Sequence, residues 1–192
     1  IYMAIRAPMM VEPEAATDVF AISTGDGTPL PFYTSGFPVD MAFHKVVTNS
    51  TSAFVLGSRL TQGKGLVTSS TAAEITEGDQ QYDYMTGWNT ETSTNTNKYS
   101  WMWKRAKGFF DVVAYTASSS AAHTVNHSLG VPPELLISRR RQATMSWYAG
   151  QVNNYLRLNT DGGNLGTPVF NNYTSTTYYV TAGTWSAGDE TI

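Results

Sequence analysis

The sequence predicts an all-β fold built from two tandem β-sandwich-like repeats of roughly 95 residues each. Charged residues make up only 14% of the chain, while Thr, Asn, Gly and aromatic residues are plentiful. Short β-branched and aromatic runs alternate with turn residues, and pieces of the first half recur in order in the second. Long helices usually need more Glu, Lys, Ala and Leu than this. At 192 residues, one large or two small domains are possible, and the repetition favours two.

Five short pieces of the chain recur further along it, in the same order and at similar offsets. The clearest pair follows the order Gly, apolar, Pro, any residue, acid, apolar, in Gly36–Met41 and Gly130–Leu135. The other pairs are Asp18–Ala21 with Asp111–Ala114, Leu66–Ser70 with Leu156–Thr160, Gln81–Thr86 with Tyr178–Thr181, and Tyr2–Ala7 with Trp101–Ala106. Small differences in the offset are what loop insertions would produce.

These pairs set the predicted domain boundaries. Residues 1–10 are predicted to be the closing strand of a preceding repeat, or a strand that completes another sheet. Residues 11–107 form repeat unit 1, and residues 108–192 form repeat unit 2, which lacks its closing strand.

The strands are predicted in order from β-branched and aromatic runs and from alternation. A single helical turn is expected over 13–17. Unit 1 closes with a strand over 99–104, on which Tyr99, Trp101 and Trp103 share one face. Their rings are predicted to be core rather than a ligand platform, and residues 104–108 are predicted to link the units. In unit 2 strands are predicted over 109–116, 123–127, 134–139, 145–148, 155–159 and 178–181.

Charge and cysteine content exclude several classes of function. A net charge of −3 gives no general attraction to nucleic acid or to anionic lipid. The chain has no cysteine, which removes disulfides, thiolate zinc sites and cysteine nucleophiles. No apolar run approaches the roughly 18–20 residues of a membrane span. We therefore expect neither a nucleic-acid partner nor membrane insertion.

An arginine run next to aromatic residues is the main candidate binding site. Arg139–Arg141 precede Trp147 and Tyr148, and the run is predicted to lie in a hairpin loop. A solvated hairpin end is the simpler interpretation. The alternative is glycan contact, because sugars are gripped by aromatic faces with planar polar groups beside them. The candidate ligand-binding residues are Arg140, Trp147 and Tyr148.

Two histidines, His123 and His127, are four residues apart. On a strand they would lie about 13 Å apart, too far to share an ion without a bend. No metal site is predicted from them.

A group of acids, Glu74, Glu77, Asp79 and Asp83, lies in a polar stretch without a counterpart in unit 2. Paired carboxylates across a cleft would be needed for glycoside hydrolysis. Asp18 and Asp111 occupy equivalent positions, which favours a structural role. The sequence contains no Ser/His/Asp arrangement, phosphate-binding loop or dinucleotide fingerprint. We predict no catalytic residues and no cofactor, and hence a protein that is not an enzyme.

Several segments resemble a repeat of tail-fibre-like virion structural proteins of bacterial viruses, especially marine ones. The resemblance is carried by Trp103–Ala117, His123–Arg141, Tyr155–Thr160 and Val169–Ser175, and by Ile1–Met9 with Gly36–Phe43. It implies a virion context and an extended protein of many repeats. It implies no particular binding or catalytic residue.

The predicted function is therefore a structural module of a bacteriophage tail fibre or related virion appendage, in host attachment or virion assembly. The alternative is a carbohydrate-binding adhesin module that recognises a host surface glycan, and a depolymerising enzyme is the third hypothesis. The expected partners are other virion proteins, further copies of the chain (a trimer being common among phage fibres) and a host glycan. The expected location is the exterior of a particle assembled in the host cytoplasm.

Overall fold

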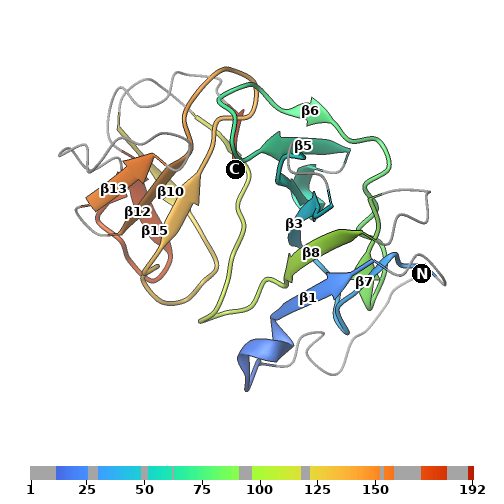
Figure 1. Ribbon diagram of the computed structural model, residues 1–192. Coiled ribbons are helices and arrows are strands. Elements are labelled where there is room, and N and C mark those ends of the chain that lie inside the picture. Colours follow the sequence, from blue (N-terminus) through green and yellow to red (C-terminus); the bar gives the residue numbers. More distant parts are fainter. Residues whose placement is uncertain are drawn as a thin grey trace, which may run out of the picture.

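The fold is all-β, as predicted. The structure is a computed structural model that describes residues 12–25, 30–48, 52–61, 63–90, 97–117, 122–151, 154–157, 170–180 and 190–192. Antiparallel strands are joined by loops and by two 3₁₀ turns, η1 (Ala16–Asp18) and η2 (Arg59–Thr61). In Figure 1 the strands coloured blue to green lie to one side, and the labelled strands β10, β12, β13 and β15 lie to the other. We call residues up to 107 the first half and those from 108 the second half.

The first half contains a six-stranded sheet with the order β1-β8-β3-β4-β5-β6. A smaller sheet pairs β2 with β7, and a bridge between Gln81 and Asn89 extends it. The strands are β1 (Phe20–Thr24), β2 (Tyr33–Thr34), β3 (Met41–Val46), β4 (Val55–Ser58), β5 (Lys64–Val67), β6 (Ile75–Thr76), β7 (Gly87–Trp88) and β8 (Lys98–Trp103).

The core of the first half is built around Trp88. Its ring is stacked between Tyr33, with ring centroids 5.5 Å apart, and Tyr82, at 5.0 Å. Its indole nitrogen donates a hydrogen bond of 2.8 Å to Ser100 Oγ on β8. Because Trp88 comes from the small sheet and Ser100 from the large one, this bond joins the two layers.

The second half contains three sheets, with the orders β10-β15-β14, β11-β12-β13 and β16-β9. Its core is a buried cluster that includes Val125, Leu136, Phe170 and Val180. The strands are β9 (Tyr115–Thr116), β10 (His123–Asn126), β11 (Leu136–Ser138), β12 (Tyr148–Gln151), β13 (Asn154–Arg157), β14 (Phe170–Asn171), β15 (Thr177–Val180) and β16 (Glu190–Thr191). Each sheet of the structure draws its strands from one half alone.

The two halves share a strand order. In the first half, β8 lies between β1 and β3, and β4 and β5 follow. In the second half, Thr191 of β16 pairs with Tyr115 of β9 on one side and bridges Arg140, just after β11, on the other. The order β9-β16-β11-β12-β13 thus matches β1-β8-β3-β4-β5. That the halves are two copies of one unit stays a prediction, and this common order supports it.

The strand pairings suggest two refinements of the predicted repeats, and the domain boundaries themselves stay a prediction. If the halves are equivalent, β16 occupies the beginning of the position that β8 has in the first half. On the same assumption β7, rather than Gln81–Thr86, corresponds to β15, because β2 pairs with β7 as β10 pairs with β15.

The prediction that the aromatic residues of β8 belong to the core is wrong. Tyr99, Trp101 and Trp103 do share one face, but the buried face of β8 carries Lys98, Ser100 and Met102. Trp101 and Trp103 are half-buried on the outer face, and Tyr99 is 36% exposed. The interior already holds Trp88 with its two stacked tyrosines, which leaves room there only for the slimmer side chains of β8.

The beginning of the second half also differs from its prediction. Phe109 is exposed and Phe110 bridges Ala106 across a turn at Gly108, whose φ is +79°. The expected strand over 109–116 is therefore reduced to β9. The predicted closing strand over residues 1–10 lies outside the described residues. Over the described ranges, no helix has the length and apolar character needed to cross a membrane.

Candidate functional site

The candidate site lies at the junction between the two halves, where buried charged and aromatic side chains meet. The segment from Arg139 to Trp147 lies on β5 and on the loop that follows it. Met145 N donates to Thr71 O at 2.9 Å, and Glu74 N donates to Arg141 O at 2.7 Å. These main-chain bonds bring together residues roughly 70 positions apart in sequence, so the junction is tertiary rather than local.

Arg139 is the central charged residue of the junction. It is 0% exposed, and Nη2 donates to the main-chain oxygen of Thr71 at 2.6 Å and also to that of Ala72. Its guanidinium carbon lies 5.9 Å from the centroid of the Trp147 ring. A buried cation is costly unless it is hydrogen-bonded, so the position of Arg139 depends on these carbonyls.

Trp147 is the central apolar residue of the junction, and it is 2% exposed. It forms a buried cluster with Leu56 and Leu66, against which Ile192 packs. Its indole nitrogen donates to Val67 O at 3.0 Å. A ring enclosed in this way has no free face on which a sugar could stack.

The arginine run is predicted to be a solvated hairpin end, and this is wrong. Arg141 Nε lies 2.8 Å from Glu74 Oε2, and both side chains are largely buried. Arg140 is half-buried beside β16, and Tyr148 lies in β12 with the Arg157 guanidinium carbon 6.0 Å from its ring centroid. The three candidate residues, Arg140, Trp147 and Tyr148, are thus placed in a sheet and in an interface, and they do not form an open platform.

Asp111 fixes the start of the second half. Its carboxylate accepts hydrogen bonds from Arg105 Nε at 2.6 Å, from Val112 N at 2.9 Å and from Ser128 N at 2.6 Å. Asp18 likewise accepts from two main-chain nitrogens near η1. Both aspartates therefore hold the neighbouring main chain in place by accepting hydrogen bonds from its N–H groups.

Asp40 fixes the end of the first half. One carboxylate oxygen accepts from Arg105 N at 2.7 Å, and the other lies 3.1 Å from Arg59 Nε. Arg105 is therefore held to the first half through its main chain and to Asp111 through its side chain. The predicted link over residues 104–108 is a fixed connection between the halves.

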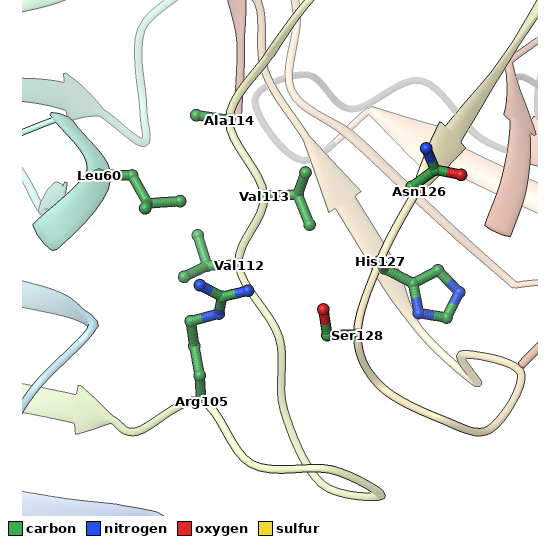
Figure 2. A pocket seen from close by; sticks show the side chains of 8 residues that line it. All are labelled: Leu60, Arg105, Val112, Val113, Ala114, Asn126, His127 and Ser128. Carbon is green, nitrogen blue, oxygen red and sulfur yellow. The ribbon is translucent and has the colours of Figure 1, made fainter. Parts of the chain in front are cut away.

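A small cleft opens beside this connection (Figure 2). It encloses about 280 Å³ and is lined by Leu60, Arg105, residues 112–114 and residues 126–128. Figure 2 shows residues 112–114 passing between Leu60 on one side and His127 on the other. Arg105 is bonded to Asp111, and His127 Nδ1 accepts from Leu129 N at 3.2 Å. The Arg105 guanidinium is thus engaged by Asp111 and the His127 imidazole by the backbone, and the wall of the cleft is about half aliphatic and half polar.

The other predicted residues lie apart from this cleft or at its edge. The His123 ring lies 5.8 Å from Tyr115, and the His127 ring lies 6.4 Å from Tyr178. Within the described ranges, no three His, Cys, Asp or Glu residues lie close enough to hold a metal ion. Among the acids, Glu74 pairs with Arg141, and burial raises the pKa of Glu77, with Asp79 adding to the rise and Lys98 opposing it.

The sequence does not predict that Arg105 contacts Asp40 through its main chain and Asp111 through its side chain. Nor does it predict that the aromatic side chains of β8 lie on the outer face. Asp40 carried a signal, because it is the acid of the repeated Gly-apolar-Pro motif. Its partner Arg105 is 65 positions away, and no local pattern identifies such a pair.

These features define a class: an all-β protein of two halves held by a buried junction. Within that class, the chain belongs to the family described as Domain of unknown function (DUF7483), whose sequence profile matches residues 17–192. No curated protein and no solved structure matches the chain.

Proposed function

We propose that the chain is a structural module of a bacteriophage tail fibre or related virion appendage, which holds neighbouring parts at a fixed angle. The observation that carries this proposal is the buried junction around Arg139 and Trp147. Modules of one chain move relative to each other unless their interface is large and apolar. Here a buried cation, an enclosed indole and main-chain bonds all cross the interface.

The shared strand order adds support, because extended appendages are commonly assembled from stacked units. In such arrays each unit contacts its neighbours, and stability is the sum of unit and interface terms. The virion context itself comes from the resemblance of Trp103–Ala117 and His123–Arg141 to tail-fibre-like repeats.

The carbohydrate-binding alternative loses its predicted site. Stacking of a sugar needs an accessible aromatic face, and Trp147 is enclosed between the halves. We therefore develop the structural function alone.

Immuno-electron microscopy of virus particles whose genome encodes the chain tests the proposal. Gold-labelled antibody raised against the purified chain should decorate the tail or its appendages. Antibody absorbed beforehand with the purified chain is the control. Specific label confined to lysate debris, with bare particles, would refute the virion assignment.

A further inference from the structure

A cation and an aromatic ring occupy equivalent places in the two halves. In the second half, Arg139 follows β11 and lies over Trp147, the residue just before β12. In the first half, Lys45 is the last residue of β3 on its outer face. It lies over Phe54, the residue just before β4. The Lys45 Nζ atom is 5.0 Å from the Phe54 ring centroid.

A third residue completes each group. Arg139 exchanges main-chain hydrogen bonds of 2.9 and 3.0 Å with Ile192, and Lys45 pairs with Tyr99 in the sheet. We call Arg139, Trp147 and Ile192 the second-half docking group, and Lys45, Phe54 and Tyr99 the first-half docking group.

The two groups differ in what covers them. The second-half group is packed against β4 and β5 of the first half. In the first-half group, Lys45 and Phe54 are only half-buried and Tyr99 is 36% exposed. Ile22 of β1 pairs with Trp101 of β8 and is 54% exposed. A cluster of partly exposed aromatic and aliphatic side chains of this kind is typical of a protein-binding surface.

This surface is continuous with the existing junction. Phe43 lies on the same face of β3 as Lys45, and it packs against the buried cluster of Leu56, Leu66 and Trp147. The rings of Phe54 and Trp101 are 5.1 Å apart, and those of Tyr99 and Trp101 are 6.3 Å apart. One apolar surface therefore runs from the covered part of the sheet to its open end.

The surface that accepts a docking group also has a counterpart. Trp147 donates to the carbonyl of Val67, which pairs with Val55 at the start of β4. In the second half, Arg157 pairs in the same way with Tyr148 at the start of β12. At Arg157, the main chain of β13 therefore has the place that the main chain of β5 has at Val67. Among the described residues, β13 is the last strand of its sheet.

We propose that the first-half docking group binds the β12–β13 edge of a second copy of this chain, head to tail, as the second-half group binds β4 and β5 within one chain. The proposal rests on the proposed function, because it assumes an array of like modules. The contact joins two different surfaces, so it extends into an open chain of molecules rather than closing as a symmetric dimer.

Sedimentation velocity with complementary variants tests this. The wild type should show a weight-average mass that rises with concentration. Phe54→Asp disrupts the apolar donor surface, and Tyr148→Lys places a positive charge at the acceptor edge against Lys45, so each variant alone should remain a monomer. An equimolar mixture should stop at dimers, because each molecule then retains one intact surface. Thr124→Asp, at an exposed position on β10, is the matched control and should associate like the wild type.

Tyr99→Lys provides a second donor variant should Phe54→Asp fail to fold, and it should also remain a monomer, because it places a further positive charge against Arg157. A wild type that stays monomeric at every concentration, or a mixture that forms no dimer, would overturn the proposal. A glycan array gives a further test. If the wild type binds the array without self-associating, and Phe54→Asp loses that binding, the proposal is overturned in favour of a sugar ligand. Gold label on virions combined with a monomeric wild type would refute the docking and leave the proposed function intact.

Discussion

At the scale of single residues, the core of the first half contains ionisable side chains. His44 is buried on the inner face of β3, with its ring centroid 5.6 Å from that of Trp88. Burial lowers the pKa of His44 to about 4, and the charge of Lys98 adds to this shift. Burial also lowers the pKa of Lys98 itself, although Glu77 acts in the opposite direction.

The depressed pKa of His44 predicts a loss of stability in mild acid. The folded protein keeps His44 neutral, whereas the unfolded chain takes up a proton near pH 6.5. The stabilising contribution is therefore complete above about pH 6.5 and declines as the pH falls toward about 4. Between pH 7 and 4.5 it should fall by about 2–3 kcal/mol, measured by urea denaturation.

His44→Gln is the matched variant, because it cannot titrate while every other acid and base remains. Its free energy of unfolding should depend less steeply on pH over the same interval. Parallel pH curves for the two proteins would contradict the assignment.

At the scale of elements, the short strands depend on close approaches between layers. Gly57 on β4 faces Gln80 and Tyr82, and an added Cβ would lie 2.5 Å from Gln80 Oε1 and 2.7 Å from the Tyr82 hydroxyl. Both neighbouring side chains are buried, so they have little freedom to move aside. The central strand β4 therefore requires glycine for packing rather than for its backbone angles.

Gly57→Ala should lower the free energy of unfolding by about 1–3 kcal/mol, because overpacking displaces Gln80 or Tyr82. Gly78→Ala is the control, since an added Cβ there has nothing within 4 Å. It should change stability by less than about 1 kcal/mol. Equal stability of the two variants, measured by chemical denaturation, would contradict the packing argument.

The elements also show how far a sequence can be interpreted. Alternation correctly places Tyr99, Trp101 and Trp103 on one face, but a period of two does not reveal which face is inside. Which face is buried depends on the packing of Trp88 and its two stacked tyrosines against β8. These rings belong to other segments of the chain, so the sequence of β8 alone does not predict the contact. The β-branched residues and turn signals predict strands over 123–127 and 178–181, and the structure has β10 and β15 there. By contrast, β9 is shorter than predicted because the chain turns at Gly108.

At the scale of the whole molecule, the junction couples the two halves. The all-β class follows from composition, but the junction does not, because its partners are distant in sequence. Arg139, Arg141 and Trp147 resemble a surface loop when only their neighbours are considered. Their burial results from the approach of residues 66–74, which depends on the complete fold.

The junction predicts that the halves unfold together. Arg139→Ala leaves the carbonyls of Thr71 and Ala72 without this donor and should cost about 2–4 kcal/mol. We expect one thermal transition in the wild type and two separate transitions in the variant, by scanning calorimetry. Gln142→Ala, at an exposed position in the same segment, should retain a single transition. A single transition in Arg139→Ala would show that the coupling lies elsewhere.

The double attachment of Arg105 has a mechanical consequence. Tension applied across the two halves reaches this residue from both directions, through Asp40 on one side and Asp111 on the other. Residues 106–110 between them are folded into a turn closed by the bonds of Ala106 with Phe110. The connection therefore cannot lengthen unless these hydrogen bonds break. Until they do, a pulling force passes directly from one β-sandwich-like half to the next.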